Sequence, residues 1–375
     1  MKYMGSKRAM LLNGLGDALH AGLPGRKRFV DLFTGSAAVA WHVAKQYDVE
    51  VIANDLQQFS VVLASSVLSR TSSLSPRSLE AWFERADTLV KGSPIYLRAL
   101  ALQKKLETEN IETLALRARE LSTHGPTPMV LAYGGYYFSP LQALTLDALR
   151  ASLPRGQASG SALASLVWAA SKCAASPGHT AQPFKANRTA GTFLKTAWQK
   201  DVVATAEAAF KKIGSIHSRK RGSAVRENAN TLAKQLRATD LVFLDPPYSG
   251  VHYSRFYHVL ETLVGGQCVE VSGTGRYPPA DRRPRSQYSL NAGAKEAFTD
   301  LMASLSDVGC DVLVTFPAGS ASNGLTGQLV TSIARKYFKI SSSKVSSRFS
   351  TLGGNRVNRE ARHAAEELIL TLTAR

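Results

Sequence analysis

Cysteine is scarce in this sequence of 375 residues. Cys173, Cys268 and Cys310 are odd in number and far apart, and no two of them form a CxxC pair. The eight histidines show no spacing typical of metal ligands. These absences argue against a disulfide framework and against a structural zinc site. They indicate a reduced, intracellular protein.

Long apolar runs are also missing. No stretch approaches the roughly 18 apolar residues that a membrane-spanning helix needs. Near the N-terminus the apolar residues 10–12 are soon followed by Asn13, Asp17 and His20, which makes a poor signal peptide. We therefore expect a protein of the cytoplasm with no membrane partner.

Acidic residues are in short supply relative to basic ones. The chain has 28 Asp and Glu against 46 Lys and Arg, which gives a formal net charge of +18. Such a surplus favours polyanionic partners, because each neutralised phosphate releases a counterion. Hydrophobic residues make up 44% of the chain and charged residues 20%, as in ordinary globular proteins. The composition therefore indicates a folded protein that binds nucleic acid.

The N-terminal region has the pattern of a βαβ unit. Residues 29–33 predict a strand, residues 34–36 a tight turn, residues 37–47 a helix, and residues 49–53 a second strand. Such a unit has parallel strands joined by a right-handed crossover.

Residues 60–205 differ in character and predict a mainly helical insertion. Leu114, Ala118 and Leu121, for example, are spaced to share one helix face. Loop-like stretches at 124–128 and 177–188 interrupt the pattern.

Strand patterns return at residues 241–244, 311–316 and 367–373, with a polar, arginine- and proline-rich loop at 265–289. The sequence therefore predicts an α/β fold with a catalytic sheet domain, residues 1–59 and 206–375, around the insertion. Ligands of open α/β sheets bind outside the carboxyl ends of the strands.

The strongest motif is Asp245-Pro246-Pro247-Tyr248, directly after an apolar strand. Two prolines cannot continue a central strand, because neither has an N–H to donate. They predict a stiff turn in which a carboxylate and a carbonyl can both accept from one NH2 group. Tyr248 offers a flat face on which a base can stack. This arrangement suits methyl transfer to an exocyclic amine.

Two further motifs follow the first two predicted strands. In the stretch Asp31-Leu32-Phe33-Thr34-Gly35-Ser36-Ala37, the glycine turn lets the backbone approach a ligand, and Asp31 can bind an ammonium group. There is no GxGxxG, so this is not the dinucleotide fingerprint. Asp55 lies 20 residues after Gly35, where nucleotide-binding α/β folds place an acid for ribose hydroxyls.

Together with residues 2–7, Lys-Tyr-Met-Gly-Ser-Lys, these motifs resemble the Dam-type family of adenine-specific DNA methyltransferases in its alpha arrangement. The resemblance implies a Rossmann-like methyltransferase sheet domain with an inserted target-recognition domain at 60–205. It also implies S-adenosylmethionine as the methyl donor, no metal, and double-stranded DNA as the substrate. Because the family is bacterial or viral, it implies a bacterial or phage-infected cell as the source. By the same resemblance, we expect the adenine to be flipped out of the duplex. The catalytic residues that the resemblance implies are Asp245, Pro246, Pro247 and Tyr248.

The same resemblance assigns the cofactor contacts. The assigned residues are Tyr3, Lys7, Asp31, Phe33, Gly35, Ser36, Asp55, Asn228 and Asp245.

At two positions the chain departs from the family. Asn228 stands where the family usually has an Asp that binds the adenine amine of the cofactor, and its amide oxygen can accept the same bond. Ala37 stands where the family often has Gly, and it is small enough for binding to persist. The stretches 253–263 and 353–371 match later family elements loosely, with no catalytic role assigned.

Contacts to the DNA backbone are expected from basic residues. The candidates are Lys211, Lys212, Arg219, Lys220, Arg221, Arg282, Arg283 and Arg285. The aromatic stretch 133–138, interrupted by glycines, predicts either a base-contacting loop or core packing. His252 and His258 are more typical of packing than of general bases.

The sequence leaves alternatives open. Similar Pro-Pro-aromatic motifs serve the methylation of cytosine in DNA, guanine in RNA and a glutamine amide in proteins, and residues 2–7 favour adenine. A catalytically silent DNA-binding relative is the alternative of another class. A cognate restriction endonuclease, phage defence and regulation are all compatible with the resemblance, as is a monomer or weak dimer.

Overall fold

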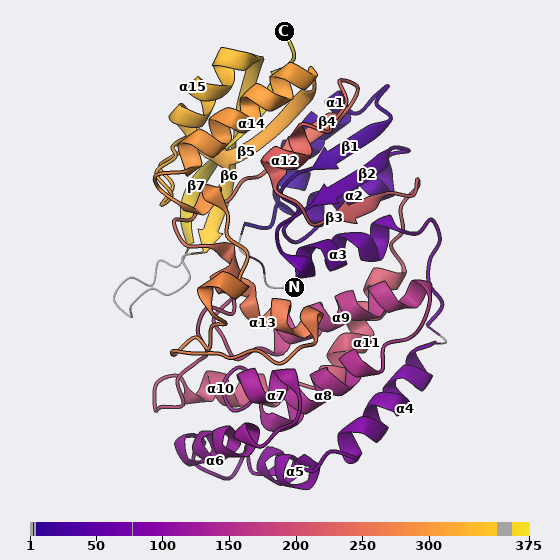
Figure 1. The fold of residues 1–375 in the computed structure, drawn as a ribbon, viewed down its shortest axis with the longest axis vertical. Helices are drawn as coiled ribbons and strands as arrows, with labels where there is room; N and C mark the ends of the chain where they lie inside the picture. Colours follow the sequence, from indigo (N-terminus) through magenta and orange to yellow (C-terminus); the bar gives the residue numbers. More distant parts are fainter. Residues whose placement is uncertain (1–2, 4, 77, 351–361) are drawn as a thin grey trace. The chain divides into compact units, whose positions relative to one another are not determined.

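The computed structural model describes residues 3, 5–76, 78–350 and 362–375, so Lys2 and Met4 of the N-terminal motif and residues 353–361 lie outside the described part. The chain forms two compact units. The sheet unit comprises residues 3–72, 217–254 and 284–375, and the helical unit comprises residues 73–216 and 255–283. Figure 1 shows the elements of each.

The sheet unit is built on a seven-stranded sheet with the strand order β3-β2-β1-β4-β5-β7-β6. Its strands are β1 (Arg28–Asp31), β2 (Glu50–Asn54), β3 (Ser223–Val225), β4 (Leu241–Leu244), β5 (Asp311–Pro317), β6 (Lys339–Ser350) and β7 (Arg362–Thr373). The first five run parallel, whereas β7 is antiparallel to both β5 and β6. The predicted Rossmann-like α/β fold is confirmed.

Helices cover both faces of this sheet (Figure 1). One face packs against α12 (Ala229–Ala233), α14 (Ala294–Val308) and α15 (Gly327–Tyr337). The other carries α2 (Ala38–Gln46) and α3 (Gln58–Leu68), with α1 (Leu15–Gly22) preceding β1. All four residues of β4 are buried, as expected for a strand covered on both faces. This is why its sequence is a continuous apolar run.

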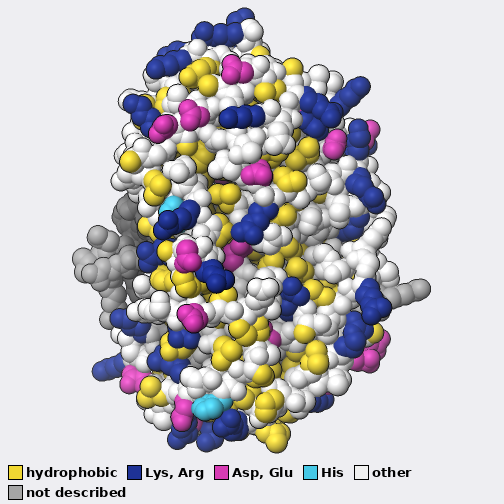
Figure 2. Space-filling model, in the orientation of Figure 1, with side chains coloured by type: hydrophobic (Ala, Val, Ile, Leu, Met, Phe, Trp, Pro, Cys, Tyr) yellow, Lys and Arg dark blue, Asp and Glu magenta, His cyan; other side chains and the backbone are white. Residues whose placement is uncertain are grey.

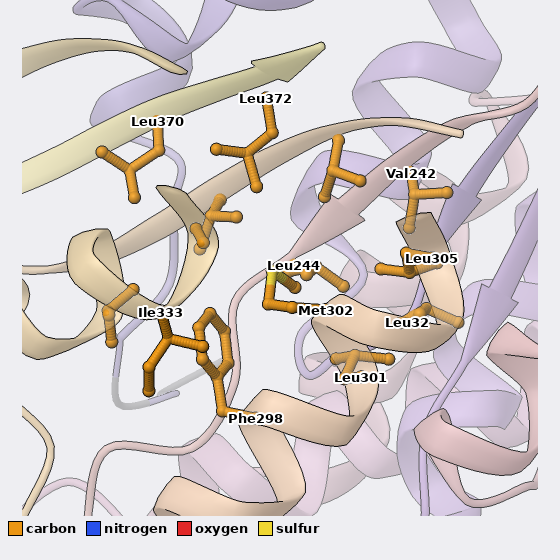
Figure 3. Packing of buried hydrophobic residues seen from close by; sticks show 14 of the residues in the cluster. Leu32, Val242, Leu244, Phe298, Leu301, Met302, Leu305, Ile333, Leu370 and Leu372 are labelled. Atoms are coloured by element: carbon orange, nitrogen blue, oxygen red, sulfur yellow. The ribbon is translucent and has the colours of Figure 1, made fainter. Parts of the chain in front are cut away.

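The core of the sheet unit lies between the sheet and α14 and α15. Figure 3 shows Leu244, Met302 and Leu305 meeting there, and all three are fully buried. Val314 and Leu370 extend the same cluster along β5 and β7. On the opposite face the rings of Phe29 and Phe243 stack with centroids 6.5 Å apart. The sheet therefore has an apolar layer on each side.

The helical unit contains α4 (Ser78–Lys91), α5 (Tyr96–Lys104), α6 (Ile111–Thr123), α7 (Pro128–Tyr133), α8 (Pro140–Ala151), α9 (Gln157–Cys173), α10 (Gly191–Trp198), α11 (Val202–Gly214) and most of α13 (Tyr253–Gly265). Leu114, Ala118 and Leu121 are buried on one face of α6, as predicted. The predicted loops at 124–128 and 177–188 fall between helices, except that Pro128 already begins α7.

The unit boundaries differ from the predicted 60–205. Residues 58–68 form α3, which packs on β2 and β3 and so belongs to the sheet unit. Residues 255–283 belong to the helical unit, where Arg276 donates to the carbonyls of Leu131 and Ala132 at the end of α7. The sheet unit is thus interrupted twice, and the second interruption begins only a few residues after Tyr248.

The aromatic stretch 133–138 packs mainly inside the helical unit. Tyr133, Tyr137 and Phe138 are fully buried. Tyr136 is partly exposed, with the guanidinium groups of Arg119 and Arg276 at 4.6 and 4.5 Å from its ring centroid. Core packing therefore accounts for most of this stretch.

His258 is a packing residue, as expected. It is buried beside Tyr133 and Tyr137, and its ring nitrogens lie 2.9 Å from the Gly275 carbonyl and 3.1 Å from the Arg255 carbonyl. Burial lowers the pKa of His258 to about 3.

Two further sequence expectations concern thiols and membranes. All three cysteines are free thiols, with Cys173 and Cys310 buried and Cys268 exposed. Among the described residues, no helix combines the length and apolar character required to cross a bilayer.

The core of the sheet unit provides a stability test. Leu301→Ala, at a fully buried position of α14, should lower the free energy of unfolding by about 2–5 kcal/mol, because it removes apolar contacts and leaves a cavity. Leu12→Ala makes the same change where the side chain is 91% exposed, and should cost under about 0.5 kcal/mol. Urea unfolding followed by circular dichroism measures both. Equal losses would contradict this core assignment.

Candidate functional site

Three acidic residues meet where neighbouring parallel strands end. Asp31 is the last residue of β1, Asp55 follows the end of β2, and Asp245 follows β4. These strands are adjacent and parallel, so their carboxyl ends share one edge of the sheet. All three side chains line one pocket, which holds about 990 Å³ of empty space with its open mouth included.

The glycine turn after β1 is braced by Asp55. The backbone N–H of Gly35 donates to Asp55 Oδ2 at 2.8 Å, and the N–H of Gln57 donates to Oδ1 at 2.9 Å. Gly35 has φ +51°, and a Cβ there would lie 2.6 Å from the hydroxyl oxygen of Tyr3. Glycine is therefore required both for the backbone conformation and for the close approach of Tyr3.

Asp245 is held by groups from two distant parts of the chain. Lys7 Nζ lies 2.9 Å from Asp245 Oδ1, and the hydroxyl of Thr315, on β5, donates to the same oxygen at 3.0 Å. Lys7 Nζ also lies 3.1 Å from Glu367 Oε2, on β7, and 5.7 Å from the ring centroid of Tyr248. The carboxylate after β4 therefore has a fixed orientation.

The proline turn is fixed from the other side by Asn323. Its side-chain amide is fully buried and donates to the carbonyls of Pro247 and Tyr288, both at 2.9 Å. Tyr248 lies over Gly5, where a Cβ would come within 2.5 Å of the tyrosine oxygen. The flat face of Tyr248 is thus positioned by the N-terminal segment.

Burial dominates the electrostatics of the pocket acids. Burial raises the pKa of Asp55 to about 6, although the hydrogen bonds from the N–H groups of Gln57 and Gly35 lower it. Burial also raises the pKa of Asp245 to about 6, although the positive charge of Lys7 lowers it. The pKa of Asp31 is also well above its usual value, because the carboxyl is buried and only the Phe33 N–H opposes the shift. Burial opposes the charge of Lys7, but Asp245 and Glu367 raise the pKa of Lys7 above its normal value.

These properties fit a cationic ligand that also carries a flat ring. Among the described lining residues, Asp31 is a buried carboxyl, Asp55 and Asp245 are partly buried carboxyls, and Lys7 is a buried cation. A positive ligand would offset the cost of keeping these carboxylates charged. Phe33 lines the pocket and packs edge-on against Tyr288 at 5.0 Å, which offers an apolar surface to a ring. The residues present therefore fit S-adenosylmethionine, which has a sulfonium, an ammonium group and an adenine.

The structure gathers the predicted site residues in one place. Tyr3, Lys7, Asp31, Phe33, Gly35, Ser36, Asp55, Asn228, Asp245, Pro247 and Tyr248 all line the pocket. Pro246 is buried. The Asn228 side-chain oxygen accepts from the Asn230 N–H at 2.9 Å and caps α12. Glu227, next to it, also lines the pocket, and its Oε1 accepts from the Asn228 N–H at 2.7 Å.

Sequence reasoning missed four residues that shape the site: Thr315, Asn323, Glu367 and Tyr288. None belongs to a recognisable motif, and all lie more than 35 residues after Tyr248 in the sequence. Thr315 and Glu367 lie in strands that the sequence predicted, but neither strand pairing nor strand direction could be deduced. His252 also lines the pocket, and its Nδ1 accepts from the Ser286 N–H at 3.3 Å.

The close approach of Tyr3 to the glycine turn can be tested. Gly35→Ala should weaken binding of S-adenosylmethionine by at least about tenfold, because the new methyl group displaces Tyr3 and strains the turn. Gly25→Ala is the matched control, since Gly25 has φ +77° but open space around its Cβ position. Isothermal titration calorimetry gives both affinities. Equal affinities in the two variants would show that the Tyr3 contact has no role in binding.

Comparison with known proteins agrees with this geometry. The family model of the D12 class N6 adenine-specific DNA methyltransferases matches residues 3–126 and 164–288, more than half of the chain. The chain is similar to the Type II methyltransferase M.FokI of Planomicrobium okeanokoites, with 26% identity over 306 residues, and to the modification methylase StsI of Streptococcus sanguinis, with 26% identity over 317 residues. These alignments cover 80% and 81% of the chain but 42% of each relative, so the chain spans less than half of their length. The chain belongs to the D12 class of N6 adenine-specific DNA methyltransferases.

Proposed function

We propose that this protein transfers a methyl group from S-adenosylmethionine to the exocyclic amine of adenine in double-stranded DNA. One observation carries the proposal. Asp245 and Tyr248 both line a pocket in which Asp31 and Asp55 suit a cationic nucleoside. A hydrogen-bond acceptor for an amine, a stacking surface for a base and a cofactor site are therefore present in one place.

The cofactor residues follow from their positions. Asp31 lies at the end of β1 and suits the ammonium group of the cofactor, whereas Asp55, directly after β2, suits the ribose hydroxyls. Since the side-chain oxygen of Asn228 already caps a helix, the neighbouring Glu227 carboxylate is a second acceptor for the adenine amine. When bound, S-adenosylmethionine supplies an electrophilic methyl group on a positively charged sulfur.

The residues of the proline turn act on the target base. Asp245 and the Pro246 carbonyl accept hydrogen bonds from the adenine amine and direct its lone pair toward the methyl group. Tyr248 stacks on the ring of the base. No covalent intermediate with the protein is required, so catalysis depends on positioning and electrostatics. A target inside a duplex must first be flipped out of the stack.

Charge supports DNA as the substrate. Figure 2 shows Lys and Arg side chains spread over the face in view, in keeping with the net charge of +18. Of the predicted contacts, Lys211, Lys212, Arg219, Lys220, Arg221, Arg282 and Arg285 are exposed and Arg283 is partly buried. We assign target recognition to the helical unit, residues 73–216 and 255–283, because it interrupts the sheet unit on both sides of the catalytic motif.

The relatives bear on the biological role. M.FokI and StsI are named as a Type II methyltransferase and a modification methylase. By analogy, this chain modifies DNA beside a cognate restriction endonuclease. Cytosine in DNA remains the main alternative target, since its exocyclic amine fits the same acceptors.

The role of Asp245 in methyl transfer can be tested by incubating the protein with labelled S-adenosylmethionine and unmethylated duplex DNA. The DNA is then digested to nucleosides. The wild type should yield methyladenine, and Asp245→Asn should reduce its rate by about 100-fold or more, because the amide cannot accept from the amine with the same strength. Asp17→Asn, at an exposed position of α1, should behave as the wild type. Methylcytosine would overturn the base assignment, and label in RNA or protein alone would overturn the substrate.

The raised pKa values predict how cofactor affinity depends on pH. A cation stabilises ionised carboxylates, so S-adenosylmethionine should bind more tightly as pH rises through about 6, where Asp55 and Asp245 lose their protons. We expect affinity at about pH 5 to be several-fold lower than at about pH 7.5. S-adenosylhomocysteine lacks the sulfonium charge and should show a smaller change. Parallel slopes for the two ligands in calorimetry would contradict the electrostatic part of this proposal.

A further inference from the structure

The ammonium group of Lys7 is shared between two carboxylates. Its Nζ lies 2.9 Å from Asp245 Oδ1 and 3.1 Å from Glu367 Oε2. The side chains of Lys7 and Glu367 are 4% and 5% exposed, and that of Asp245 is 16% exposed. Asp245 is therefore the member of this cluster that the pocket reaches most easily, while Glu367 lies behind it.

Glu367 comes from a part of the chain far from the motifs. It lies on β7, opposite Pro317 of β5, and outside both stretches that the family model matches. Its neighbour Glu366 points the other way, with a side chain 58% exposed and paired with Lys344 at 3.0 Å. A buried carboxylate without a charged partner is costly, so the inward side chain depends on Lys7.

The charges of the cluster do not cancel. With both carboxylates ionised and one lysine protonated, the cluster carries one net negative charge inside the protein. If Glu367 were neutral, Lys7 would neutralise Asp245 alone. Asp245 would then be a weaker acceptor for an amine that becomes positive during the reaction.

Resting on the proposed function, we propose that Glu367 is a positioning residue for methyl transfer: by sharing Lys7, it leaves the excess negative charge of the cluster on Asp245. Glu367 touches neither base nor cofactor in this scheme. Thr315, which donates to the same Asp245 oxygen as Lys7, fixes the orientation of the carboxylate.

The reaction shows where this charge acts. The lone pair of the adenine amine forms the new N–C bond while the S–C bond breaks, and the electron pair of that bond stays on sulfur. Positive charge thus moves from sulfur to nitrogen, next to Asp245, until the nitrogen loses one proton to water. The net negative charge of the cluster matches the single positive charge that arrives.

Charged groups around Asp245 define the pH response. Lys7 from the N-terminal segment lowers the pKa of Asp245, Glu367 from β7 raises it, and Asp31 from β1 is coupled to it through space. Removing the charge of Glu367 should therefore lower the pKa of Asp245. The acidic limb of the rate profile, where Asp245 becomes protonated, should move to lower pH while the plateau rate falls.

The test compares Glu367→Gln with Glu366→Gln, which removes the same charge from the opposite side of β7. We expect Glu367→Gln to lower the single-turnover methylation rate about tenfold at its plateau, less than loss of a direct contact costs. The acidic limb of the pH–rate profile of Glu367→Gln should move to lower pH. The pH midpoint of its affinity for S-adenosylmethionine, measured by calorimetry, should move in the same direction. Glu366→Gln should match the wild type in all three. Glu367→Asp keeps the charge, so its acidic limb should stay near that of the wild type.

The outcomes separate this inference from the proposed function. If the wild type forms no methyladenine, the proposed function fails. If the wild type is active and the acidic limb of Glu367→Gln coincides with that of Glu366→Gln, Glu367 is only structural and the inference fails. Thermal melting of each variant reports folding. If Glu367→Gln does not fold, Glu367→Asp decides, because a shifted acidic limb in a variant that keeps the charge would overturn the charge-sharing role.

Discussion

Parallel strands that lie side by side must end at the same edge of their sheet, and the site of this protein depends on that constraint. Because β1, β2 and β4 are neighbours, the acids at or directly after their carboxyl ends share one pocket although they come from positions 31, 55 and 245. The helical unit can interrupt the chain twice without disturbing this arrangement, since strand pairing alone holds the three ends together. The chemistry is thus carried by the sheet, and the interruptions are free to vary.

Gathering acids at one edge has an electrostatic cost, and the structure meets it in different ways at each acid. Asp55 accepts two backbone N–H groups, so its charge also braces the glycine turn. Asp245 forms an ion pair with Lys7 and accepts a hydrogen bond from the Thr315 hydroxyl. Among the described residues, the Asp31 side chain accepts one long bond, from the Phe33 N–H at 3.3 Å, and burial raises its pKa well above the usual value. The acid with the weakest internal support is therefore the one with most to gain from a positive ligand.

Much of the sheet and its motifs could be predicted from the sequence, because they are local. The βαβ unit, the apolar run of β4 and the Pro-Pro turn each occupy a few consecutive residues with a distinct pattern. The strands β3 and β6 were not predicted: β3 is short and only partly buried, and the described part of β6 is largely polar and exposed. The unit boundaries differed because α3 has the composition of the insertion yet packs on the sheet.

Contacts between distant residues are the part that no local pattern shows. Lys7 was expected to touch the cofactor, and it does line the pocket, but its two ion pairs depend on the pairing of β7 with β5. That pairing is antiparallel, which turns Glu367 toward a site made otherwise from parallel strands. The contact between Glu367 and Lys7 therefore depends on the direction of β7. Strand direction is set by the pairing of the whole sheet, which no short stretch of sequence shows.

The departure at Ala37 shows how packing can override a local preference. Ala37 has φ +60°, in the left-handed region where a side chain costs about 1–2 kcal/mol relative to glycine. Its N–H nevertheless donates to the Thr34 carbonyl at 2.9 Å, and its carbonyl accepts from the Trp41 N–H to start α2. The residue is fully buried, so its methyl group gains contacts that glycine would lack. Strain and packing therefore offset each other at the turn, and the turn keeps the conformation that the pocket requires.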